Sequence, residues 1–66
     1  MSFVEYRNQV IKELSTTYGY TKEQVNEFLS KKNIDDTLRT NYTRYSEQKF
    51  AGCEPKATAS CLDMMY

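Results

Sequence analysis

The sequence predicts an all-α fold: a small three-helix bundle in residues 1–52, followed by a C-terminal tail or short fourth helix in residues 53–66. Two capping boxes, "SFVE" and "TKEQ", mark helix starts. Apolar residues recur every three or four positions, as on one face of a helix. No segment alternates apolar and polar residues for long enough to form a strand. These observations favour helices joined by short loops.

The first helix is expected over residues 2–17, where Ser2 and Glu5 form the capping box. Its apolar positions fall on one broad arc when residues are placed at about 100° intervals. Gly19 provides a stop signal. The arc consists of Phe3, Val4, Tyr6, Val10, Ile11 and Leu14.

The second helix is expected over residues 22–32, with Thr21 as its N-cap and Gln24 three residues later. Tyr20, Val25, Phe28 and Leu29 form a narrow apolar stripe. Lys31 and Lys32 would then lie in the last turn, where positive charge suits the helix dipole, and Asn33 would be the C-cap.

The third helix is expected to begin at Asp35 and Asp36, because carboxylates favour a helix N-terminus. It should fade near Lys49 and end before Gly52. Beyond it, Pro55 suits the first turn of a short helix, although a loose tail is the alternative. Such a helix would place Ala57, Cys61, Leu62 and Met65 on one side. The most buried residues are expected to be Leu14, Phe28, Leu29 and Leu38.

Composition limits the function classes. A chain of 66 residues allows one small core and little room for a buried cleft. Nine basic and nine acidic residues cancel, which argues against binding nucleic acid mainly through phosphate neutralisation. The first ten residues lack a signal-peptide pattern, and no apolar run could span a membrane. The expected location is therefore cytoplasmic. Abundant Asn, Thr, Lys and Tyr are typical of an AT-rich genome, and a small bacteriophage or mobile-element gene would fit.

The sequence offers little for catalysis. It has no histidine, no glycine-rich phosphate loop and no carboxylate pair at a spacing suited to acid–base chemistry. Cys53 and Cys61 cannot by themselves fill a four-ligand zinc site, and in a reducing compartment they should be free thiols. We therefore expect no catalytic residue, no metal and no cofactor. The Asp35–Asp36 pair is interpreted as a helix cap.

Tyrosines and arginines instead suggest a protein-binding surface, because both residue types are enriched at interfaces. On the third helix, the candidates are Arg39, Tyr42, Arg44 and Tyr45. The alternative for the tyrosines is that they cover the edge of a small core with their hydroxyls in water.

Arg7 interrupts the apolar arc of the first helix and also allows two interpretations. Its stem could cover the core edge. Otherwise the arc divides into a core face and a second face of Val4, Arg7 and Ile11 directed at another chain. Such a bifacial helix would suit a homodimer.

A helix-turn-helix is the alternative function, because residues 21–45 have the length of two helices and a turn. Arg39, Asn41, Thr43 and Arg44 are types that contact bases and phosphates. However, Arg39 and Arg44 lie about 140° apart around a helix, so they are not on the same face and could not contact one groove together. Acidic residues at the expected helix start also oppose DNA binding.

The stretch "GYTKEQVNEFLSKKN" resembles ubiquitin-associated domains in outline over residues 10–45. These are three-helix modules with a Gly-aromatic turn before the second helix. The resemblance implies a partner site at that turn and at the end of the third helix. It departs from the family where Tyr18 replaces a methionine and where Asn41, Tyr42 and Tyr45 replace small and aliphatic residues. We interpret it as a shared way of packing three helices.

These observations predict a small, non-catalytic protein-binding module, such as a phage-type accessory protein or inhibitor of a host protein. A nucleic-acid-binding helix-turn-helix is the second hypothesis.

Overall fold

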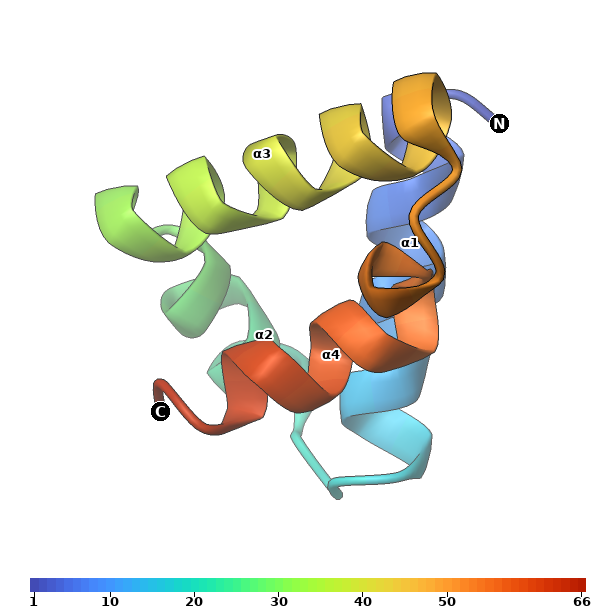
Figure 1. Cartoon of the computed structure of the whole chain (residues 1–66). Helices are drawn as coiled ribbons and strands as arrows, with labels where there is room; N and C mark the ends of the chain where they lie inside the picture. Colours follow the sequence, from blue (N-terminus) through green and yellow to red (C-terminus); the bar gives the residue numbers. More distant parts are fainter.

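A computed structural model describes residues 1–66 and contains four α-helices, one short 3-10 helix and no strand. The all-α prediction is confirmed. Figure 1 shows the C-terminal part of α3 at the N-terminal end of α1, while α4 crosses α1 and packs against it. The elements are α1 (Phe3–Thr16), α2 (Lys22–Leu29), α3 (Lys32–Gln48), η1 (Ala51–Cys53) and α4 (Pro55–Asp63).

Both predicted capping boxes are present and start α1 and α2. The Glu5 N–H donates to Ser2 Oγ at 3.2 Å, and the Ser2 N–H donates to the Glu5 carboxylate at 3.2 Å. Thr21 and Gln24 make the same reciprocal pair. These bonds satisfy N–H groups that have no partner within the helix. Accordingly, each helix begins directly after its capping residue.

The predicted boundary between the second and third helices is wrong. α2 ends at Leu29, and α3 begins at Lys32, three residues before the predicted Asp35. Asn33 is therefore inside α3 and is not the C-cap of α2. The early start places Ile34 in the core, where it is 1% exposed. Burial of this large side chain favours helix at a position without a side-chain cap.

Residues 55–63 form a helix, so the loose-tail alternative is not observed. Its predicted apolar face was largely wrong, because Cys61 and Met65 are exposed and only Leu62 of that set is buried. The face turned to the core instead consists of Thr58, Ala59 and Leu62. Thr58 was missed because threonine is usually exposed.

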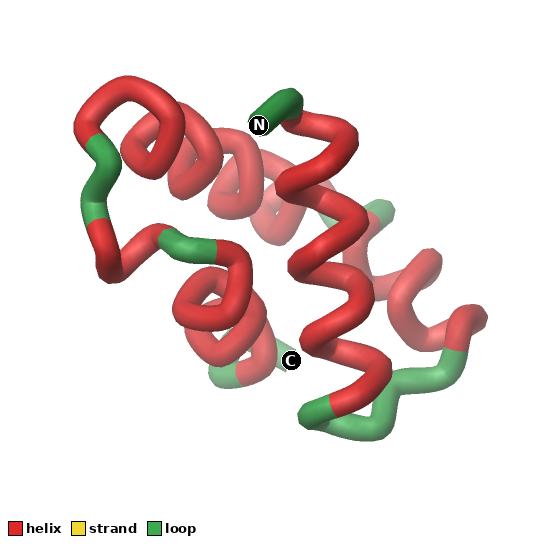
Figure 2. Tube along the Cα trace, turned by 90° about the vertical axis from the view of Figure 1, so that its right-hand side faces the viewer, coloured by secondary structure: helices red, strands yellow, loops and turns green.

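The core draws on every α-helix. Figure 2, viewed from another side, shows α1 running past the other helices, and its packing is most extensive against α4. The four residues predicted to be most buried are all buried. The core cluster is Tyr6, Val10, Leu14, Val25, Phe28, Leu29, Ile34, Leu38, Ala59 and Leu62.

A buried polar network joins the two ends of the chain. The Tyr6 hydroxyl donates to the Cys53 carbonyl at 2.5 Å and lies 2.6 Å from Thr58 Oγ1. Because Tyr6 has only one hydroxyl hydrogen, Thr58 acts as the donor between these two hydroxyls. The Asn41 side-chain amide donates to Thr58 Oγ1 at 3.3 Å. The network therefore connects α1, α3, η1 and α4.

None of the helices combines the length and the apolar character that crossing a bilayer requires.

Candidate functional site

The candidate partner-binding residues do not gather in one place. Arg39 and Tyr42 meet at the N-terminal end of α1, where both contact Phe3. Tyr45 lies against the ring of Tyr6 and makes no contact with Phe3 or Arg39. Arg44 is exposed on α3, about 140° around the helix from Arg39.

The Arg39 guanidinium is held by two neighbours. Its Cζ lies 4.5 Å from the centroid of the Phe3 ring, within the range of a cation–π interaction. Its Nε donates to Asp35 Oδ2 at 2.8 Å, one helical turn away. The Arg39 side chain nevertheless stays 62% exposed, and that of Asp35 is 35% exposed. The guanidinium thus has a defined orientation and remains open to solvent.

A chain of aromatic rings connects the Phe3 ring, which contacts Arg39, to the core. Phe3 meets Tyr42 edge-on with 5.4 Å between ring centroids, and Tyr42 lies 5.3 Å from the buried ring of Tyr6. The Tyr42 hydroxyl donates to the Met1 carbonyl at 3.0 Å. Such ring pairs restrict each other's orientation. The Phe3 ring that contacts Arg39 is therefore joined to the core through Tyr42 and Tyr6.

Tyr42 and Tyr45 cover the core edge, as the alternative interpretation expected. That interpretation was wrong in placing the tyrosine hydroxyls in water, because those of Tyr6, Tyr20 and Tyr42 donate to groups of the protein. Tyr42 and Tyr45 are only partly exposed and pack against the core cluster. Burial raises the pKa of Tyr6 above its ordinary value, so its hydroxyl stays protonated and keeps its hydrogen bond to Cys53. Tyr42 nevertheless remains partly exposed.

The second face considered for α1 is smaller than expected. Ile11 packs against the core cluster, Arg7 is partly exposed, and only Val4 is largely exposed, at 66%. Arg7 follows Phe3 by four residues and so shares its side of the helix. We use the term α1–α3 surface for Phe3, Arg7, Arg39 and Tyr42.

Phe3 is the residue of this surface that sequence reasoning missed. The apolar arc placed it on the inner side of the first helix, and it is only partly buried. Its contact with Arg39 depends on where α3 crosses α1. Periodicity within one helix contains no information about that crossing.

The start of α3 changes the helix-turn-helix comparison. Only Ser30 and Lys31 separate α2 from α3, and the exposed Lys31 and Lys32 now stand at the helix start. Asp35 is occupied by its ion pair with Arg39. Asp35 still lies in the first turn of α3, so the objection that acidic residues stand near the start of this helix is reduced but not removed.

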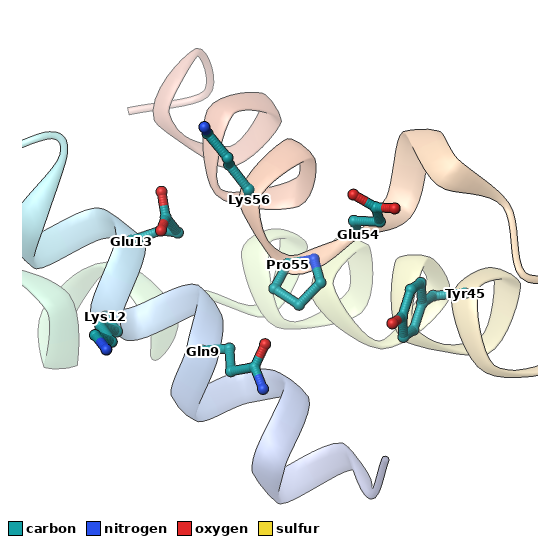
Figure 3. A pocket seen from close by; sticks show the side chains of 7 residues that line it. All are labelled: Gln9, Lys12, Glu13, Tyr45, Glu54, Pro55 and Lys56. Carbon is teal, nitrogen blue, oxygen red and sulfur yellow. The ribbon is translucent and has the colours of Figure 1, made fainter.

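A shallow hollow of about 430 Å³ lies between α1 and the start of α4. Figure 3 shows its lining, in which two lysines and two glutamates balance in charge. None of these side chains forms an ion pair in the structure. The lining residues are Gln9, Lys12, Glu13, Tyr45, Glu54, Pro55 and Lys56.

Potential metal ligands are dispersed in this fold, and no three of its Cys, Asp and Glu side chains come together in a group that could hold an ion. Both cysteines are free thiols, with Cys53 buried and Cys61 exposed. Comparison with protein-family models, with curated proteins and with solved structures found no match to this chain.

Proposed function

We propose that this protein is a non-catalytic module that binds another protein through its α1–α3 surface. One observation supports this most strongly: Arg39 is fixed on the Phe3 ring and paired with Asp35, yet its side chain remains largely exposed. Arginine and aromatic residues contribute most binding hot spots, and a fixed side chain loses less entropy when a partner binds.

The surroundings of Arg39 also suit a protein contact. Val4 follows Phe3 in the first turn of α1 and exposes its apolar side chain, and Met1 is 51% exposed nearby in the chain. Protein interfaces combine such apolar area with aromatic and arginine anchors. Occupation of this surface would make the protein a small accessory or inhibitor of a larger one.

The test uses peptides selected from a random display library on the immobilised protein. We expect bound peptides to shift the NMR resonances of Phe3, Arg39 and Tyr42. Arg39→Ala and Tyr42→Ala should each weaken peptide binding by about 2 kcal/mol. Arg44→Ala is the matched control, because Arg44 lies on the same helix outside the surface. The proposal would be refuted if the selected peptides shift only resonances of other regions, or if they bind the Arg39→Ala variant as tightly as the unchanged protein.

Two controls keep this test interpretable. Each variant must retain the far-ultraviolet circular dichroism of the unchanged protein. Sedimentation of Val4→Asp beside the unchanged protein then tests whether a second copy of the chain is the partner. A homodimer that uses the first turn of α1 should dissociate, since a buried unpaired carboxylate is costly.

Nucleic-acid binding is the second candidate, favoured by the two-residue connection and by Lys31 and Lys32 at the start of α3. If α3 enters a groove, Lys31→Ala and Lys32→Ala should each reduce the salt slope of DNA binding by about one. Arg39→Ala and Arg44→Ala would act in the same way if they contact phosphates. Unchanged retention on a DNA column in all four variants would exclude this function.

A further inference from the structure

The N–H donors of Arg39 that remain unused indicate which chemical group of a partner would bind there. A guanidinium has five N–H donors, of which one is on Nε and four are on the two η nitrogens. The Nε donor is used by Asp35, whereas no acceptor within the chain lies at either η nitrogen. The end of the guanidinium is therefore the part still able to bind, and its two parallel N–H groups match the two oxygens of a carboxylate.

The orientation of this edge is set before any partner arrives. Phe3 supports one face of the guanidinium at 4.5 Å, and Asp35 fixes the Nε side at 2.8 Å. A planar group held on two sides cannot rotate freely, so little orientational freedom remains to be lost on binding. Lysine in this position could provide charge but not two parallel donors.

The charge of the surface is also suitable. Arg7 has no carboxylate three or four positions away on α1, where helical neighbours meet, and it forms no ion pair. The α1–α3 surface with Asp35 thus has two guanidinium groups and one carboxylate. A single additional carboxylate would neutralise it. A doubly charged phosphate would leave the surface with a net negative charge.

We infer that the partner segment inserts an Asp or Glu carboxylate end-on against the η nitrogens of Arg39, with an apolar neighbour on Phe3 and Val4. This inference rests on the proposed function and specifies the chemistry of the partner. The ring of Tyr42 packs edge-on against Phe3, so apolar area lies next to the charge.

The experiment compares peptides selected on the protein with derivatives in which one acidic residue at a time becomes its amide. We expect one such change to weaken binding to the unchanged protein by about tenfold or more. The same acid-to-amide change should have little effect on peptide binding to the Arg39→Gln variant, because the peptide carboxylate and the Arg39 guanidinium would be energetically coupled. Arg39→Lys should lose most of the preference for the acid, whereas Arg44→Gln should keep it.

The outcomes separate the inference from the proposed function. Peptides that bind the α1–α3 surface without any acid-to-amide effect would overturn the carboxylate assignment but leave the protein-binding proposal standing. A peptide that binds more tightly when phosphoserine replaces its acid would assign the edge to phosphate instead. Failure of every selected peptide to shift Phe3, Arg39 and Tyr42 would overturn the proposed function, and this inference with it.

Discussion

Tyr6 and Thr58 lie 52 positions apart in the sequence, yet their hydroxyl oxygens are 2.6 Å apart in the core. Both side chains are fully buried, and the Tyr6 hydroxyl in turn donates to the Cys53 carbonyl. A polar group buried in this way is tolerated only because it has partners. The pair therefore fixes how the C-terminal helix is positioned on the first one.

Removing the Tyr6 hydroxyl should destabilise the protein. Tyr6→Phe keeps the ring but leaves Thr58 and the Cys53 carbonyl without their shortest hydrogen bonds. We expect the free energy of unfolding to fall by about 1–3 kcal/mol, measured by urea denaturation. Tyr45→Phe is the control, because the Tyr45 hydroxyl makes no hydrogen bond in the chain. Equal effects of the two changes would contradict the assigned network.

Leu62 should be as important for stability as Leu29. Both are buried in the core cluster, Leu29 on α2 and Leu62 on α4. Leu62→Ala and Leu29→Ala should each cost about 2–5 kcal/mol, enough to unfold much of a domain of this size. Met65→Ala, at an exposed position of the same C-terminal segment, should change stability by less than about 0.5 kcal/mol. Thermal melts followed by circular dichroism would measure all three.

Stability should fall at alkaline pH. Burial, together with the Asp63 carboxylate that accepts the Tyr20 hydrogen bond, raises the pKa of Tyr20, and burial raises that of Tyr6. A tyrosine of the unfolded chain ionises near pH 10. The stability that comes from the two raised pKa values is therefore complete below about pH 10 and is lost as the pH rises further.

Urea midpoints measured from about pH 8 to about pH 11 would reveal this loss. Tyr20→Phe should flatten the decline with pH, because it removes one of the two responsible groups. Tyr42→Phe removes a tyrosine hydroxyl that influences neither of these two pKa values and serves as the comparison. A decline that is the same in both variants would mean that Tyr20 is not responsible.

The two thiols should react at very different rates. Cys61 is exposed on α4, whereas Cys53 is 3% exposed beside the Tyr6 hydroxyl. Brief treatment of the native protein with a thiol reagent should modify Cys61 alone, as read by mass spectrometry. Cys53 should react only after denaturant opens the core. Comparable modification of both residues in native conditions would contradict the burial of Cys53.

Capping residues made the first two helices predictable from sequence. Ser2 and Thr21 act through residues three positions away, so the necessary information is local. The start of α3 follows a different logic. Lys31 provides no side-chain cap, and Lys32 puts positive charge at the positive end of the helix dipole. Tertiary burial of Ile34 outweighs these local penalties, and sequence patterns do not reveal it.

The candidate surface was predictable in residue type but not in arrangement. Arginine and tyrosine on α3 correctly drew attention to Arg39 and Tyr42, which the structure brings together on Phe3. Tyr45 and Arg44 were grouped with them because they share a helix, although they point elsewhere. Burial of Thr58 was equally hidden, since it depends on a hydroxyl from the other end of the chain.

The packing of α4 on α1 has a consequence for biosynthesis. A ribosome makes α4 after α1, α2 and α3, and until then Tyr6, Val10 and Leu14 lack the helix against which α1 packs most extensively. A nascent chain stalled before Pro55 would expose this apolar face to proteases and to other nascent chains. Native burial of the first helix therefore requires that the last one has left the ribosome.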